Sequence, residues 1–138
     1  MLDAPGEPMS NRILIVDDNP VNLKLAADVL EADSFVIDRA VDAEQAQRVL
    51  NDTVPDLILM DIALPGMDGL TLTRKLKADP RFEDIPIIAL TASAMKGDDY
   101  KALEAGCTSY ITKPIDTRRL AQQLRTILDS ERAPRQDK

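Results

Sequence analysis

Short apolar runs alternate along the chain with segments in which apolar residues recur at helical spacing. The runs cover 12–16, 35–40, 57–61, 87–90 and 109–112, and Pro, Gly, Asn, Asp or Lys residues lie at their ends. Apolar runs bounded by turn residues predict strands buried on both faces. Helical periodicity predicts helices over 20–32, 43–50, 69–78 and 96–106, and a last helix after Asp116. Strands that alternate with helices predict an α/β fold with a parallel sheet and right-handed crossovers.

Each predicted helix combines an apolar stripe with residues that mark its ends. Pro20 suits a first helical turn, Asp42 and Asp116 suit N-terminal caps, and Gly106 suits a left-handed C-terminal cap. The residues predicted to face the core are Leu23, Ala26, Ala27, Leu30, Ala43, Ala46, Val49, Leu50, Leu72, Leu76, Leu120, Leu124, Ile127 and Leu128.

The chain has the size of one domain, with 138 residues of which 44% are hydrophobic. Residues 1–10 contain two Pro and one Gly without periodicity, which predicts a disordered leader. We expect one domain over 11–129 and a flexible polar tail over 130–138. The Met1 start and the polar finish favour a stand-alone protein, but a piece of a longer protein stays an alternative.

Charge and composition exclude several classes of protein. A formal net charge of −7 argues against a nucleic-acid partner. No apolar run approaches the roughly 18–20 residues that span a bilayer and no signal peptide opens the chain, so we expect a cytoplasmic protein without membrane insertion. Cys107 is the single cysteine and is expected to be buried. The absence of His removes imidazole metal ligands, Ser-His triads and any phosphohistidine within this chain.

Polar residues stand at the carboxyl ends of four predicted strands: Asp17 and Asp18, Asp61, Thr91, and Lys113. Because the strands are predicted to be parallel, these ends share one edge of the sheet. Three carboxylates there repel one another unless a cation compensates them, and Mg²⁺ or the Lys113 ammonium group would do so.

A metal, an ammonium group and a hydroxyl around one carboxylate meet the requirements of phosphoryl transfer. Asp61 is then a nucleophile that forms an acyl phosphate, and it needs no general base because a carboxylate is ionised near neutral pH. Taken singly, the same residues have simpler interpretations. Asp17 and Asp18 are also typical of a helix cap, Asp61 of a strand end, and Thr91 and Lys113 of a cap and a solvated side chain.

Five motifs in order resemble the receiver domain of two-component response regulators. They are Val16-Asp17-Asp18-Asn19, Leu57-Ile58-Leu59-Met60-Asp61, Leu64-Pro65-Gly66-Met67-Asp68-Gly69, Leu90-Thr91-Ala92 and Tyr110-Ile111-Thr112-Lys113-Pro114. The resemblance covers about 11–128 and is nearest to single-domain regulators of the cell-division and chemotaxis type, through 18–22 and 94–98. Receivers attached to hybrid kinases share much of this pattern. The resemblance implies a flavodoxin-like fold, a doubly wound five-stranded parallel sheet in the order 2-1-3-4-5.

The resemblance also implies roles for the polar residues. Asp61 would be the phosphoacceptor, and Thr91 and Lys113 would bind the phosphoryl oxygens. Asp18, Asp61 and the backbone carbonyl of Ala63 would be direct Mg²⁺ ligands, whereas Asp17 would hold a metal-bound water.

Three further expectations follow from the same resemblance. The Lys113–Pro114 peptide bond would be cis. Thr91 would move toward the phosphoryl group, and Tyr110, the switch aromatic, would fill the space that Thr91 leaves. The face formed by the predicted helix 96–106, the strand 109–112 and the last helix would change and be read by a downstream protein.

The phosphodonor would be a histidine kinase or a histidine phosphotransfer protein. By resemblance it would dock near Asn19, Pro20, Val21, Asn22 and Ile115. The unphosphorylated protein would be a monomer, with a dimer as an option for the phosphorylated form.

The lifetime of the phosphorylated form depends on the residues that flank the acceptor. Ala63 and Ser93 offer little to orient an attacking water, so we expect this form to be long-lived.

Two other classes of protein are alternatives to this interpretation. A Mg²⁺-dependent phosphohydrolase would need a second acid near the nucleophile, but Ala63 stands two residues after Asp61 and no insertion is long enough for a lid. A binding module without phosphorylation would not need all five polar residues. We therefore expect a protein that catalyses only its own phosphoryl transfer and autodephosphorylation and is not a metabolic enzyme.

Overall fold

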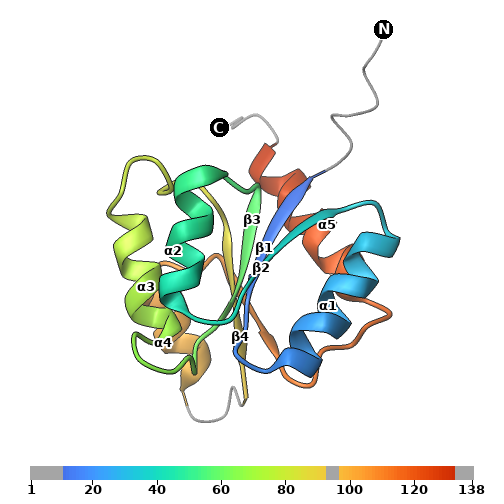
Figure 1. Cartoon of the computed structure of the whole chain (residues 1–138), viewed down its shortest axis with the longest axis horizontal. Coiled ribbons are helices and arrows are strands. Elements are labelled where there is room, and N and C mark those ends of the chain that lie inside the picture. The colour runs from blue at the N-terminus through green and yellow to red at the C-terminus, as the bar shows by residue number, and fades with distance from the viewer. Residues whose placement is uncertain (1–10, 93–96, 133–138) are drawn as a thin grey trace, which may run out of the picture.

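The computed structural model describes residues 11–92 and 97–132. Within these ranges, five strands alternate with five helices (Figure 1). The strands are β1 (Arg12–Val16), β2 (Val36–Ala40), β3 (Leu57–Asp61), β4 (Ile87–Thr91) and β5 (Ser109–Thr112). The helices are α1 (Pro20–Ala32), α2 (Ala43–Asp52), α3 (Gly69–Lys77), α4 (Asp98–Ala105) and α5 (Leu120–Arg132).

The strands form one parallel sheet in the order β2-β1-β3-β4-β5. Helices α1 and α5 cover one face of the sheet, and α2, α3 and α4 cover the other (Figure 1). The doubly wound, flavodoxin-like α/β architecture and its strand order are therefore confirmed.

The core consists of two apolar layers, one on each face of the sheet. Alternate residues of one strand enter different layers, so Leu14 packs with α2, α3 and α4 while Ile13 packs with α1 and α5. Every residue of β3 and β4 is buried, because these central strands are covered on both sides. The predicted core positions are buried, except that Val49 and Ile127 are only partly covered. Cys107 is buried as expected, and burial raises the pKa of its thiol.

The ends of several elements differ from the prediction. Helix α5 begins at Leu120, because the Asp116 carboxylate instead accepts a hydrogen bond from the Arg118 N–H at 3.0 Å in a turn that precedes the helix. The same helix continues to Arg132 and so includes the first residues assigned to a polar tail. Helix α4 begins at Asp98, after Gly97 with φ of 80°.

Some predictions fall outside the described residues: the leader over 1–10, the tail over 133–138, and the roles of Ser93 and of residues 94–96. Among the described residues, no helix is long and apolar enough to cross a membrane.

Candidate functional site

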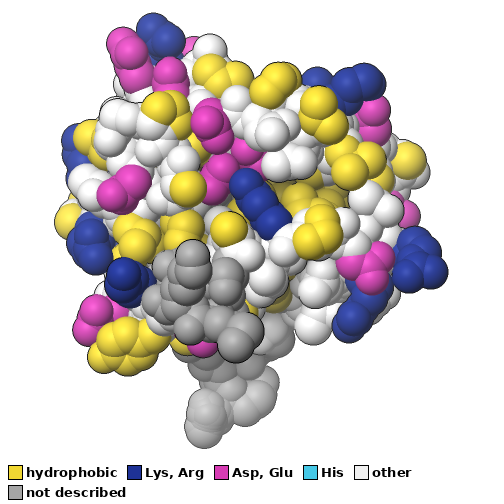
Figure 2. Space-filling view, turned by 90° about the horizontal axis from the view of Figure 1, so that it is seen from below, with side chains coloured by type: hydrophobic (Ala, Val, Ile, Leu, Met, Phe, Trp, Pro, Cys, Tyr) yellow, Lys and Arg dark blue, Asp and Glu magenta, His cyan; other side chains and the backbone are white. Residues whose placement is uncertain are grey.

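The site lies at the carboxyl edge of the sheet, where β1, β3, β4 and β5 end. Viewed from this edge, acidic side chains gather beside a basic side chain near the middle of the molecule (Figure 2). Asp17, Asp61, Thr91 and Lys113 come from the ends of these four strands, and the fold brings them to one place although they are distant in sequence.

Asp61 is at the end of the central strand β3, and its side chain is held from two sides. One carboxylate oxygen, Oδ1, accepts a hydrogen bond from the Ala63 N–H at 2.9 Å. The other, Oδ2, accepts one from Lys113 Nζ at 3.0 Å. The residue is 3% exposed. A carboxylate with both oxygens held has a fixed orientation toward whatever approaches the edge.

The loop after β1 positions the other two acids. Asp17 is 1% exposed and its Oδ1 accepts a hydrogen bond from the Asn19 N–H at 2.9 Å. The Asn19 side chain in turn caps α1 by accepting from the N–H groups of Val21 and Asn22. Asp18, which lies between Asp17 and Asn19 in the sequence, is exposed. One turn therefore ends the strand, starts the helix and presents both carboxylates.

The three carboxylates fit a hard divalent cation. Asp17, Asp18 and Asp61 each offer a carboxylate oxygen, and these oxygens lie within 4.8 Å of one another. In the described part of the chain, this is the group of acidic side chains that is close enough together to hold a metal ion. Oxygen-only donors that include carboxylates are the ligands that Mg²⁺ prefers. This acidic pocket therefore has the composition of a Mg²⁺ site.

Charge and burial oppose each other in this cluster. Burial raises the pKa of Asp17 above its usual value, although the hydrogen bond from Asn19 and the charge of Lys113 lower it. Burial lowers the pKa of Lys113, but the hydrogen bond and charge of Asp61 and the charge of Asp17 outweigh it, and the pKa is raised. Lys113 therefore remains a cation, and its Nζ lies 3.5 Å from Asp17 as well.

Thr91, the last residue of β4, brings a buried hydroxyl to the same edge of the sheet. Its side chain is fully buried, and Oγ1 has no hydrogen-bond partner among the described residues. A buried polar atom left unpaired costs about 1–3 kcal/mol, so a ligand oxygen that accepted from it would recover that energy. Tyr110, two positions before the end of β5, is 36% exposed.

The loop after β5 has the expected backbone geometry. The Lys113–Pro114 peptide bond is cis. The Lys113 N–H donates to the Thr91 carbonyl at 2.7 Å, which joins the ends of β4 and β5.

The residues expected to contact a phosphodonor differ in accessibility. Val21 is 72% exposed at the start of α1, and Asn19 and Pro20 are also exposed, whereas Asn22 and Ile115 are half-buried. Leu25, one turn after Val21, is 46% exposed and belongs to the same apolar surface. Leu25 was not predicted from the sequence, although an apolar residue on the polar side of a helix, four positions from Val21, was the available signal.

Gly69 is a second residue whose importance only the structure shows. Asp68 caps α3 by accepting from the Thr71 N–H, as the turn pattern indicated. A Cβ atom on Gly69, however, would overlap the backbone carbonyl oxygen of Asp61. The first residue of α3 must therefore lack a side chain for the acceptor strand to end where it does.

Fold and site together define a doubly wound α/β domain with an acidic cluster and a lysine at the carboxyl edge of its sheet, and known proteins share this arrangement of fold. The sequence profile of the response regulator receiver domain matches residues 13–125. The chain therefore belongs to the response regulator receiver domain family of two-component signalling. It is a signalling protein and not a metabolic enzyme, and membership implies contacts with kinases or phosphotransfer proteins and with downstream targets.

Individual relatives support the same assignment. The polar-differentiation response regulator DivK of Brucella ovis is 41% identical over 120 residues, which are 87% of this chain and 98% of that protein. The signal receiver domain of a signal transduction histidine kinase from Syntrophus aciditrophicus has a TM-score of 0.82 and 32% identity, covering 94% of this chain and 98% of that one. A CheY-like receiver domain protein from Methanospirillum hungatei has a TM-score of 0.81 and 30% identity, covering 88% and 96%.

Proposed function

We propose that this protein is a switch that is set by phosphorylation of Asp61. The observation that carries the proposal is the set of groups around this one carboxylate: the Lys113 ammonium group at 3.0 Å, the acids of the cluster, and the unpaired Thr91 hydroxyl. An aspartate used only to end a strand would need none of these partners.

In the proposed reaction, an Asp61 carboxylate oxygen attacks the phosphorus of a phosphohistidine. A P–O bond forms, the P–N bond of the donor breaks, and its electron pair stays with the imidazole nitrogen. The donor is a histidine kinase or a histidine phosphotransfer protein, because this chain contains no His. The exposed surface of Asn19, Pro20 and Val21, with Asn22 and Ile115 beside it, is the proposed docking site.

The neighbouring residues have distinct roles in this proposal. Bound Mg²⁺ would neutralise charge that develops on the phosphoryl oxygens. Asp18, Asp61 and the Ala63 carbonyl would hold it directly, and Asp17 through a water. Lys113 Nζ would move from the carboxylate to a phosphoryl oxygen and remain a cation throughout, which its raised pKa favours.

The output step follows from the electrostatics of the product. The phosphoryl group of the acyl phosphate carries roughly −1.5 to −2 charge by analogy with other phosphorylated side chains, and it replaces the single negative charge of the Asp61 carboxylate. Thr91 Oγ1 would donate to a phosphoryl oxygen, and Tyr110, now partly exposed, would turn into the vacated space. The face formed by α4, β5 and α5 would change, and a downstream protein would bind it.

Further properties belong to the same proposal. The phosphorylated form would be long-lived, since the exposed Ala63 has no group that orients water for autodephosphorylation. The protein would be cytoplasmic, would act as a monomer before phosphorylation, and would be able to dimerise after it.

The proposal is tested by incubating the protein with phosphoramidate and Mg²⁺ and measuring intact mass. We expect one phosphoryl group per chain, labile to acid and base, in the wild type and in the matched control Asp52→Asn, which changes an exposed carboxylate at the end of α2. Asp61→Asn should gain none. Equal phosphorylation of Asp61→Asn, or no mass gain in any variant, would rule the proposal out.

A further inference from the structure

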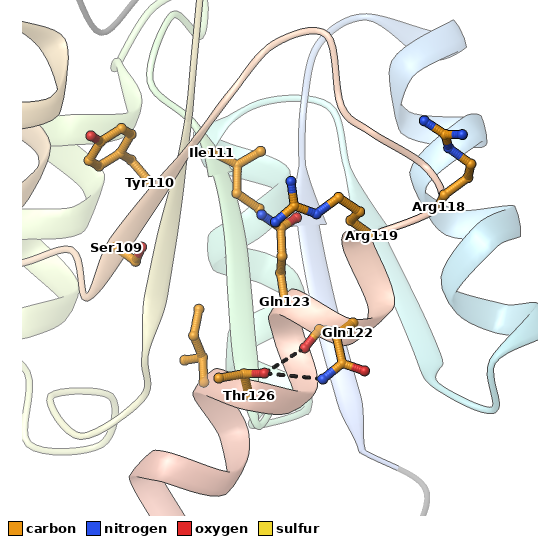
Figure 3. Close-up of a pocket in the computed structure, with 9 residues that line it drawn as sticks. Ser109, Tyr110, Ile111, Arg118, Arg119, Gln122, Gln123 and Thr126 are labelled. Carbon is orange, nitrogen blue, oxygen red and sulfur yellow. Dashed lines mark hydrogen bonds between the residues drawn. The ribbon is translucent and has the colours of Figure 1, made fainter.

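A groove of about 560 Å³ lies between β5 and α5 (Figure 3). Tyr110 and Ile111 contribute to it from β5, and Arg119, Gln123 and Ile127 contribute from α5. None of its nine lining residues is acidic. Since β5 is the last strand of the sheet, no further strand covers this side of it.

Exposed apolar side chains also occur on the two elements next to the groove, β5 and the helix α4, which covers the other face of the sheet (Figure 1). Ile111 in the groove is buried, whereas Tyr110 is 36% exposed. On α4, next to β5, Tyr100 is 66% exposed and Leu103 is 48% exposed. Tyr100, Leu103 and Tyr110 thus leave apolar area exposed on the face formed by α4, β5 and α5, and exposed apolar area of this kind is typical of a surface that binds another protein.

Two adjacent arginines at the groove behave differently. The Arg118 side chain points away from β5, and its Nε lies 3.6 Å from Asp116 Oδ1 (Figure 3). The Arg119 side chain extends toward β5 and Ile111 (Figure 3). Among the described residues, no carboxylate or other acceptor pairs with the Arg119 guanidinium. Arg125 on the same helix is paired with an acid within this chain, whereas Arg74 on α3 also lacks an acid partner among the described residues.

We propose that Arg119 is the residue that selects the downstream partner, by pairing with a carboxylate of a protein segment that lies in this groove. An apolar side chain of the same segment would pack against Ile111 and Ile127. This inference rests on the proposed function, since the groove is part of the face formed by α4, β5 and α5.

Charge favours a protein segment that carries a carboxylate over the other molecules that could bind in this groove. A net charge of −7 opposes the approach of nucleic acids and anionic lipid surfaces. The exposed Arg119 guanidinium has no partner among the described residues and extends toward Ile111, so it instead favours one local carboxylate of a protein segment that lies in the groove.

The test is a selection from a random peptide library displayed on phage, with the whole chain as the target. We expect the selected sequences to be enriched in Asp or Glu next to a large apolar residue. Fluorescence polarisation with one selected peptide should show at least a tenfold weaker affinity for Arg119→Glu. Arg118→Glu, which makes the same charge change one residue away, should stay within about twofold.

A charge exchange completes the experiment. A peptide whose acid is replaced by Lys should bind Arg119→Glu better than it binds the wild type. Equal losses in Arg118→Glu and Arg119→Glu, selected peptides without acidic enrichment, no selected peptide, or binding only to anionic vesicles would each overturn the proposal. Both arginines are exposed, so thermal unfolding of the two variants should match the wild type and excludes misfolding as the cause.

The outcome also separates this inference from the proposed function. Arg119→Glu should be phosphorylated by phosphoramidate as fast as the wild type, because it lies outside the carboxylate site. If the peptide binds through Arg119 but phosphorylation leaves its affinity unchanged, the switch is wrong and the specificity of Arg119 stands. If Asp61 is phosphorylated and Arg119 has no effect on binding, the reverse holds.

Discussion

Gly69 shows how one residue without a side chain fixes the acceptor. Its absent Cβ leaves room for the carbonyl oxygen of Asp61, which is backbone and therefore does not move out of the way. Gly66, three residues earlier, needs glycine for another reason: its φ is +71°, while a Cβ there would meet nothing within 4 Å. Gly69 is therefore required for steric reasons, whereas Gly66 is required for its backbone conformation.

We predict that Gly69→Ala lowers the free energy of unfolding by about 2 kcal/mol or more, because the new methyl group overlaps backbone atoms. Gly66→Ala should cost about 1 kcal/mol, the strain of a left-handed backbone. Urea denaturation measures both. Gly69→Ala should also slow phosphorylation by phosphoramidate, since the end of β3 must shift. A loss no larger than that of Gly66→Ala would contradict the steric argument.

Among the elements, α5 is joined to the end of α1 by one side chain. Arg125 donates from Nε and Nη2 to the Asp33 carboxylate at 3.0 and 2.8 Å, and from Nη2 to the Asp33 carbonyl. Its guanidinium also lies 4.6 Å from the ring centroid of Phe35, which is buried in the layer under α1 and α5. A planar fork that also stacks on a ring is a contact that Lys cannot reproduce.

We predict that Arg125→Ala lowers the free energy of unfolding by about 1 kcal/mol, since the pair is half exposed and solvent screens it. Arg125→Lys should recover less than half of this loss. A double-mutant cycle with Asp33→Ala, followed by urea denaturation, isolates the coupling between the two residues. Full stability of Arg125→Lys would show that charge alone, without the fork or the ring contact, holds α5 in place.

For the molecule as a whole, the acidic cluster links stability to divalent cations. Asp17 and Asp61 are buried and Asp18 is exposed, yet all three contribute oxygens within 4.8 Å, in a chain that is already negative. Any cation that binds the folded form and not the unfolded one stabilises it by mass action.

We predict that Mg²⁺ raises the unfolding temperature of the wild type, by an amount equivalent to about 2.7 kcal/mol at one hundred times its dissociation constant. Asp18→Asn should reduce this response strongly and leave stability without Mg²⁺ almost unchanged, because Asp18 is exposed. Differential scanning calorimetry with and without a chelator provides the measurement. Asp52→Asn serves as the control for general screening, and an equal Mg²⁺ response in both variants would contradict a site at the cluster.

The sequence predicted the elements of this molecule well because hydrophobic pattern is a local property. Apolar runs such as 57–60 are strands because they are covered on both faces, and stripes such as Leu23, Ala26 and Leu30 face the core because helical spacing places them there. Ends of elements were less accurate. Asp116 had the composition of a helix cap, yet its carboxylate closes a turn before α5 begins.

The sequence predicted which residues form the site, but it did not predict the contacts that these residues make. Polar residues after parallel strands must meet at one edge, which brings Asp61 and Lys113 together over 52 positions of sequence. Gly69 and Arg119 carry no periodic signal that separates them from ordinary turn and charged residues, and for Leu25 the only signal is its spacing of four positions from Val21. Each acquires its importance from a neighbour supplied by another part of the fold, or from the lack of one.

The amino-acid sequence by itself therefore determined the alternation of strands and helices, the edge where the polar residues gather, and the residues that gather there. Only the tertiary structure decided that both oxygens of Asp61 are held, that the Thr91 hydroxyl has no partner in the described chain, and that Arg119 lies unpaired over a groove while Arg118 does not. The reason is physical: pattern sets which side of an element is buried, whereas contacts between elements depend on how loops and packing place them in space.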